Sequence, residues 1–176
     1  MNKGYGVTIE SAEQAGMIAL RAGDEGRTRV AGLFGTPLPS LPFVACADGQ
    51  TIMPVACDEW LIITGDASAT FTALDELMEG HHGAVAEVTD AYGWFRVGGP
   101  EARAVMAQVV ALDLDAPYTT SAGVTVTTYG RTAIGRAAGI VVRHRCPESY
   151  DLYVDITHTR YTLTLLRACA GLGVPS

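Results

Sequence analysis

Apolar and polar positions along the chain follow two periods, and the points where the period changes predict its strands and helices. Residues 52–65 alternate and then run apolar, which predicts a strand over about Glu59–Thr64. A helix is expected over Asp66–Gly80, with Asp66 or Ser68 as its N-cap, because a short polar side chain there precedes apolar residues at helical spacing. The residues expected on the buried side of this helix are Phe71, Leu74, Leu77 and Met78.

A second strand-to-helix pattern follows directly. Residues 84–99 predict one long or bulged strand, or two short strands, with Gly93 at the kink. Pro100 is expected at the first position of the next helix, where its missing N–H is not needed. That helix is predicted over Ala102–Leu112, and its expected buried stripe is Val105, Met106, Val109 and Leu112.

The C-terminal third repeats the mixture of strands and a helix. Strands are predicted over Val124–Gly130, Ile134–Arg145 and Tyr150–Ile156. Thr157 or Thr159 is expected to cap a last helix, whose inward residues are Leu163, Leu166, Cys169, Ala170 and Leu172. Because the first two strands look like a hairpin, the pattern predicts an α+β fold with a mixed, mostly antiparallel sheet and helices packed on one side.

One segment, Gly32–Gly49, does not fit either period. Its prolines deny the backbone N–H donors and favour an extended, irregular conformation, while apolar side chains lie between them. We therefore expect residues 32–49 to form a proline-rich loop that docks on an apolar partner surface. The residues expected to make this partner interface are Phe34, Leu38, Leu41 and Phe43.

Composition narrows the class of protein. The chain has 176 residues, which predicts a single domain over residues 1–176. Apolar residues make up 48% and charged residues 18%, so part of the apolar surface is expected to be an interface, with a well-packed monomer as the alternative. The net charge of −7 argues against nucleic acid or an anionic membrane as the main partner. Without a signal peptide or an apolar span, the expected location is the cytoplasm.

The sequence contains no recognisable catalytic, metal-binding or phosphate-binding motif. His81 and His82 are adjacent in a glycine-flanked turn, where their side chains point apart, so a solvated turn is expected rather than a metal site. Pro100 removes a donor from the helix N-terminus that an anion would need, and Glu101 places a negative charge in the first turn. We therefore expect this chain to hold no catalytic residue and no metal ligand.

Four short motifs nevertheless occur in a characteristic order between Gly6 and Gly173. They are DEWL at residues 58–61, EVT at 87–89, GGPEA at 98–102 and LDL at 112–114. Their order and spacing resemble the gamma subunit of heterotetrameric sarcosine oxidase and of related N-methyl amino acid oxidases and dehydrogenases. The resemblance implies structural roles for the motif residues Asp58, Glu59, Trp60, Thr89, Gly99, Pro100, Leu112, Asp113 and Leu114.

The resemblance implies a fold related to the folate-binding domain of aminomethyltransferases. It also implies a noncatalytic structural subunit of an oxidoreductase acting on CH–NH groups, whose one-carbon product passes to tetrahydrofolate. The gamma subunit has no cofactor of its own: alpha would hold NAD and folate, beta FAD and FMN, and delta zinc. The chain has Glu87-Val88-Thr89 where the family often has Asp-x-Ser, and Gly98 where serine is common, so the resemblance does not specify the substrate.

Two other functions remain open at this stage. The first is a stand-alone folate-binding or aminomethyltransferase-like protein, which needs a carboxylate for the pterin and a basic residue for the glutamate tail. The candidates for these folate contacts are Glu87 and Arg96, although each also fits a structural ion pair. The second is a free-standing structural module with an unrelated partner.

Overall fold

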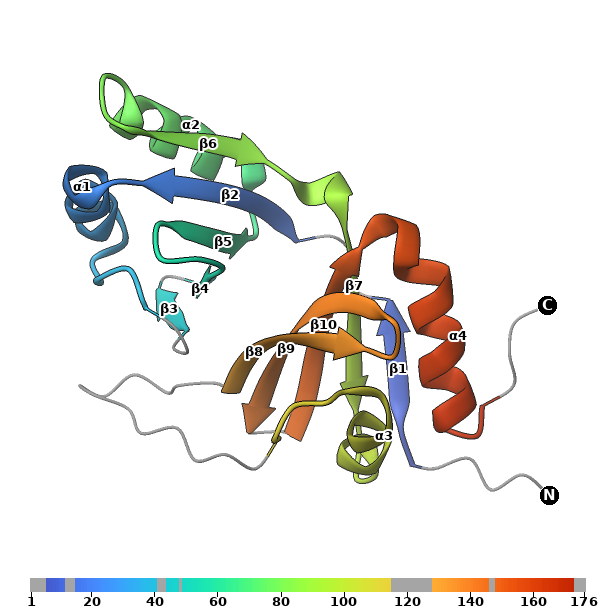
Figure 1. The fold of residues 1–176 in the computed structure, drawn as a ribbon. Helices are drawn as coiled ribbons and strands as arrows, with labels where there is room; N and C mark the ends of the chain where they lie inside the picture. The colour runs from blue at the N-terminus through green and yellow to red at the C-terminus, as the bar shows by residue number, and fades with distance from the viewer. Residues whose placement is uncertain are drawn as a thin grey trace. The chain divides into compact units, whose positions relative to one another are not determined.

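A computed structural model shows an α+β fold with two antiparallel five-stranded sheets and four α-helices in the part of the chain that it describes. The described residues are 6–11, 15–40, 44–47, 49–114, 128–145 and 148–172. The chain separates into two compact units, here called unit 1 and unit 2, each with one sheet and two helices (Figure 1). The α+β class with antiparallel pairing is confirmed, with two sheets in place of one mixed sheet; the single domain over residues 1–176 stays a prediction.

Unit 2 is built from one sheet with the strand order β3-β4-β5-β2-β6. Its strands are β2 (Gly16–Ala22), β3 (Ala45–Ala47), β4 (Gln50–Pro54), β5 (Glu59–Thr64) and β6 (Gly83–Glu87). Its helices are α1 (Asp24–Phe34) and α2 (Ala67–Met78). Side chains of the sheet and of both helices share one core: Ile18, Leu20, Ala22, Val30, Phe34, Leu38, Ala45, Ile52, Trp60, Ile62, Leu74 and Met78.

The local sequence explains where the helices of unit 2 begin and end. The Asp66 carboxylate accepts a hydrogen bond of 3.0 Å from the Ala69 N–H, so Asp66, of the two candidates, is the N-cap of α2. Helix α1 ends at Gly35, whose φ of 62° is the left-handed conformation that closes many helices. Gly32 and Phe34 thus belong to the last turn of α1, so the loop prediction was wrong for this start of the proline-rich segment.

Unit 1 has the strand order β1-β7-β10-β9-β8. Its strands are β1 (Thr8–Ser11), β7 (Tyr92–Gly98), β8 (Thr128–Ile134), β9 (Ala137–Arg145) and β10 (Glu148–Asp155). Its helices are α3 (Ala102–Val109) and α4 (Thr159–Cys169), with the short 3-10 helix η2 (Ile156–His158), and a second 3-10 helix, η1 (Thr89–Ala91), begins at the last described residue of unit 2. The buried core includes Phe95, Val97, Val105, Met106, Val141, Tyr150, Leu152, Val154 and Leu166.

The strand pattern of residues 84–99 forms two strands in different sheets, β6 and β7, joined through η1. Gly93 lies inside β7 and not at a kink. A Cβ on Gly93 would lie 2.3 Å from the Thr159 hydroxyl oxygen, so glycine permits the close approach of the segment that starts α4. The kink prediction was therefore wrong, because the glycine serves packing.

The C-terminal hairpin is confirmed, with different boundaries. Strand β8 begins at Thr128 and includes Ile134, while β9 begins at Ala137. Residues 124–127 of the predicted strand lie outside the described residues. Neither threonine caps α4 with its side chain: Asp155 accepts the Thr157 N–H at 2.9 Å and so begins η2. None of the described helices is long and apolar enough to cross a membrane.

Candidate functional site

The candidate site in unit 1 is centred on Asp151, a carboxylate in the middle of β10. Antiparallel pairing places Arg96 of β7 directly opposite it. The Arg96 Nε donates to one carboxylate oxygen at 2.7 Å and Nη2 donates to the other at 2.8 Å. The Asp151 side chain is only 4% exposed, whereas that of Arg96 is 45% exposed. The pair is therefore a forked salt bridge whose acid is inside the protein and whose base is at the surface.

His144 of β9 is the second partner of the Asp151 carboxylate. Its Nε2 lies 2.8 Å from Oδ2 of Asp151, and its side chain is 36% exposed. Burial alone would raise the pKa of Asp151, but the hydrogen bonds from Arg96 and His144 outweigh it and hold the pKa below its ordinary value. The carboxylate is thus ionised and engaged on both oxygens, which suits it to positioning its neighbours and not to accepting a substrate proton.

Aromatic side chains fix the guanidinium from a second direction. Arg96 lies over the Trp94 ring at 5.4 Å from its centroid. Trp94 itself stacks on Tyr153, with ring centroids 5.8 Å apart and an interplanar angle of 20°. Burial raises the pKa of the Tyr153 hydroxyl, so this ring stays neutral. The arrangement gives Arg96 a fixed position on the sheet.

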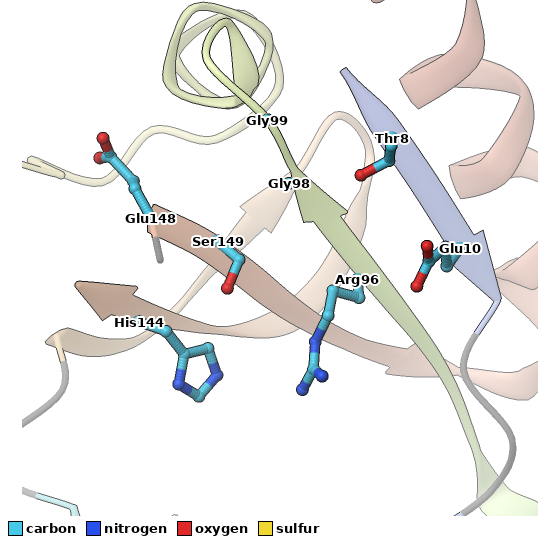
Figure 2. Close-up of a pocket in the computed structure, with 8 residues that line it drawn as sticks. All are labelled: Thr8, Glu10, Arg96, Gly98, Gly99, His144, Glu148 and Ser149. Carbon is cyan, nitrogen blue, oxygen red and sulfur yellow. The ribbon is translucent and has the colours of Figure 1, made fainter. Parts of the chain in front are cut away.

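A polar depression of about 440 Å³ opens beside this cluster (Figure 2). Its lining residues are Thr8, Glu10, Arg96, Gly98, Gly99, His144, Glu148 and Ser149. In Figure 2 the side chains of Arg96 and His144 extend from the same face of the sheet, while Glu148 points the other way. The volume is in the range of small-ligand sites, and the lining offers charges of both signs with hydroxyl groups between them. Such a surface can hydrogen-bond a small polar ligand or a polar side chain of a partner.

Replacing Asp151 with asparagine is expected to lower the free energy of unfolding by about 1–3 kcal/mol near neutral pH. The low end applies if the half-exposed Arg96 turns to water once its partner has lost its charge. Because the folded-state pKa of Asp151 is depressed, its contribution is present above the ordinary carboxyl range, about pH 4, and is lost as pH falls through the folded-state value.

Urea unfolding at several pH values measures this effect. The difference between wild type and Asp151→Asn should be largest near neutral pH and should shrink as the medium becomes acidic. Asp90→Asn, at an exposed position, is the matched control and should change stability little. A difference between wild type and Asp151→Asn that does not depend on pH would contradict the role given to this carboxylate.

The two sequence-predicted folate contacts fall in different units. Glu87 is exposed at the end of β6 in unit 2, and its Oε1 accepts a hydrogen bond of 3.2 Å from the Thr89 hydroxyl. Arg96 is on β7 in unit 1 and is held in the ion pair with Asp151. The structural interpretation of Arg96 as an ion-pair residue is thus confirmed. Glu87 has a neighbouring hydroxyl as its hydrogen-bond donor.

The DEWL motif stabilises unit 2. Asp58 accepts a hydrogen bond of 2.9 Å from Arg21 Nε, and this hydrogen bond lowers the pKa of the Asp58 carboxyl. Glu59 lies 3.9 Å from the same nitrogen. Trp60 is 1% exposed, and its Nε1 donates to the Pro39 carbonyl at 2.8 Å. Trp60 is thus a core residue of unit 2, while Asp58 and Glu59 lie beside Arg21 at its surface.

The remaining motif residues lie at turns and in cores. Thr89 accepts the Met17 N–H on its hydroxyl at 3.0 Å. Gly99 has a φ of 104° at the junction before α3, with the exposed Pro100 next to it. Leu112 is partly buried and Leu114 is buried in the core of unit 1, with the exposed Asp113 between them.

The predicted partner-interface residues divide into two groups. Phe34 and Leu38 are each 8% exposed and belong to the core of unit 2, so their apolar character is explained by packing within the chain. Leu41 and Phe43 lie outside the described residues. Among the described residues of this region, Leu33 is an exposed apolar side chain, at 45%. Because Phe34 and Leu38 are buried in this core, they do not support the predicted partner interface.

Within the described part of the chain, no group of three or more His, Cys, Asp or Glu side chains is placed to hold a metal ion. His81 lies near a single acid, with Nδ1 3.6 Å from Glu25. Sequence reasoning named Arg96 but missed Asp151 and the part played by His144. The available signal was the acid Asp151 among the otherwise apolar residues of YDLYV, residues 150–154.

Comparison with solved structures assigns the fold. A chain of heterotetrameric sarcosine oxidase from Corynebacterium sp. U-96, in complex with pyrrole 2-carboxylate, matches with a TM-score of 0.80 at 20% sequence identity, covering 93% of this chain and 83% of that chain. Glycine cleavage system aminomethyltransferase T from Bartonella henselae matches with a TM-score of 0.63 at 12% identity, covering 96% of this chain and 47% of that chain. No protein-family model and no curated protein matches the sequence.

By its fold, the chain belongs with a sarcosine oxidase chain and an aminomethyltransferase, which share this architecture. The predicted resemblance is therefore confirmed at the level of the fold. The chain spans about half the length of the transferase and most of the length of the oxidase chain, so its extent is similar to that of one chain of the oxidase assembly.

Proposed function

We propose that the chain is a noncatalytic structural subunit, of the gamma type, in a heterotetrameric flavoprotein that oxidatively demethylates sarcosine or a related N-methyl amine. The observation that supports it is the TM-score of 0.80 over 93% of this chain and 83% of one chain of the sarcosine oxidase. In this proposal the alpha, beta and delta partner subunits hold FAD, FMN, NAD, tetrahydrofolate and zinc, and the one-carbon unit passes to the folate.

The candidate site agrees with a structural role. Arg96 is fixed by Asp151 and Trp94, and both oxygens of Asp151 are engaged. Such a cluster presents an ordered polar surface at low entropic cost, which is what a subunit contact needs.

Native mass spectrometry of the tagged chain, purified at natural abundance from its own cells, tests the proposal. The expected result is an assembly with other chains and a flavin absorption spectrum. Cells that produce the untagged chain, taken through the same purification, are the control. A chain that is recovered alone, without flavin, would contradict the proposed function.

A second candidate function is a stand-alone folate-binding protein. It is favoured by the likeness to aminomethyltransferase T together with the 440 Å³ polar depression of unit 1. Against it, the Nε and Nη2 donors of Arg96 already bind Asp151. The carboxylate of Asp151 thus neutralises the positive charge that would attract the glutamate tail of a folate. If this candidate is right, tetrahydrofolate at about 100 times its dissociation constant should stabilise the isolated chain by about 2.7 kcal/mol, and Arg96→Lys should reduce that gain.

A further inference from the structure

Among the residues that the structure describes, strand β6 forms one edge of the sheet in unit 2 and is paired on one side only, with β2. The hydrogen bonds alternate along this pair: the His82 carbonyl accepts the Gly23 N–H at 3.1 Å, and the Val88 N–H donates to Met17 at 2.8 Å. Because antiparallel pairs alternate by two residues, even-numbered residues of β6 face β2. The backbone N–H and C=O groups of Gly83, Val85 and Glu87 therefore point away from it, along the open edge.

Natural sheets protect such edges with lysine, proline, a bulge or a covering segment. Strand β6 has the sequence Gly-Ala-Val-Ala-Glu, which contains neither lysine nor proline. Its residues are exposed except Val85, which packs partly against the core. Apart from Glu87 at its end, this edge consists of small uncharged residues, so it is an open template for one more strand.

A hollow of about 360 Å³ runs between this strand and α2. In Figure 1, α2 lies beside β6 at the edge of the sheet. The hollow is lined by Gly83, Ala84 and Val85 of β6, by Met78, and by three acids of α2 and its C-cap: Asp75, Glu76 and Glu79. A strand added to β6 would therefore extend its side chains alternately toward these carboxylates.

The three acids lie at the C-terminal end of α2. The C-terminal end of a helix carries partial negative charge, so carboxylates there are unfavourable by a few tenths of a kcal/mol each or more. The last turn of α2 contains no basic residue. None of the ion pairs within the described residues involves these acids. A cation brought by another chain would relieve both the dipole and the mutual repulsion.

We propose that the free edge of β6 pairs with a lysine- or arginine-bearing strand of a partner chain, whose basic side chains lie in the acidic hollow beside α2. This inference rests on the proposed function, in which the chain acts inside an assembly of several chains. A second copy of this chain fits poorly, because it would bring the same acids and a net charge of −7 to the contact. The occupant is therefore a different, basic polypeptide segment.

Hydrogen exchange at single amides of the full chain tests the inference. The probe is a synthetic peptide of alternating lysine and valine. The expected result is about tenfold slower exchange at the edge amides of Gly83, Val85 and Glu87, and little change at Ala84 and Ala86, which face β2. A peptide of alternating glutamate and valine should leave all five amides unchanged.

Variants separate edge pairing from general attraction to an acidic protein. Asp75→Lys combined with Glu79→Lys should weaken binding of the lysine peptide by about tenfold. Glu101→Lys, which makes an exposed charge change in unit 1, is the control and should have little effect. Val85→Pro removes one outward N–H at a position where an edge strand tolerates proline, and should also weaken binding.

The assembly purified to test the proposed function provides the deciding comparison. Slower exchange at the same three edge amides in the assembly than in the free chain supports the inference; unchanged exchange there overturns it, while the subunit role stands. If no partner is recovered, the proposed function fails, and the peptide experiment on the free chain tests the edge site by itself. Slower exchange at the edge amides that depends on Asp75 and Glu79 then supports the edge site, and unchanged exchange overturns it.

Discussion

Trp60→Ala is expected to lower the free energy of unfolding by about 3–5 kcal/mol, because removal of a large buried aromatic side chain leaves a cavity. Trp60 is 1% exposed in the core of unit 2. Its indole N–H holds the Pro39 carbonyl at 2.8 Å, and Arg27 lies 5.2 Å from its ring centroid. The substitution thus removes core packing and a contact that ties the proline-rich segment to β5.

Urea or thermal unfolding followed by circular dichroism measures the loss. Trp60→Phe, which keeps most of the ring volume but not the hydrogen bond, should lose clearly less. Leu33→Ala, at a side chain 45% exposed, is the matched surface control and should stay within about 0.5 kcal/mol of wild type. A Trp60→Ala protein as stable as this control would contradict the central position of Trp60.

Gly99→Ala is expected to destabilise the chain by about 2–4 kcal/mol through two independent effects. The φ of 104° at this glycine is one that residues with a side chain rarely adopt. In addition, a Cβ there would lie 2.3 Å from the backbone oxygen of Gly6, so the chain before β1 would have to move. Both effects act at the junction of β7 and α3.

Two other glycines provide matched controls for these effects. Gly35 also has a positive φ, of 62°, but no atom lies within 4 Å of the position that a Cβ would take, so Gly35→Ala should cost only about 1–2 kcal/mol. Gly32 lies in α1 with open space around it, and Gly32→Ala should be neutral or stabilising. Equal losses at Gly99 and Gly35 would show that the contact with Gly6 contributes nothing.

Elements with a clear period and a clear terminus were predictable from the sequence. Strand β5 occurs over Glu59–Thr64 as predicted, and α2 begins after one of its two candidate caps. Helix α1 was not predicted, because its buried residues Gly26, Val30 and Phe34 form a narrow stripe that begins with glycine. Strands β1 and β2 were not predicted either, although β2 is largely apolar.

The assignment of strands to sheets could not be predicted from the pattern. A period of two indicates which residues share a face of a strand, but it carries no information on which sheet the strand joins. Strands β6 and β7 are close in sequence and belong to different sheets. The motif order did predict the fold, because the motifs extend over nearly the whole chain and their order can be compared with that of a family of known fold.

The candidate site was predicted only in part for the same reason. Arg96 was recognised as a basic residue that needs a partner, but Asp151 lies 55 positions later in the sequence. Only the register of β7 against β10 brings the two side chains together. The bonds to Arg96 and His144 then explain why a buried acid is tolerated in this strand, and neither partner is visible in the local sequence.

The order of the strands along the chain has a consequence for biosynthesis. All five strands of unit 2 come from the continuous stretch Gly16–Glu87, whereas β1 of unit 1 precedes that stretch and must pair with β7 after it. A ribosome therefore delivers everything that the sheet of unit 2 needs before β7 and β10 exist. The N-terminal strand must wait, unpaired, while roughly half of the chain is made, and during that interval its exposed edge is open to chaperones or to mispairing.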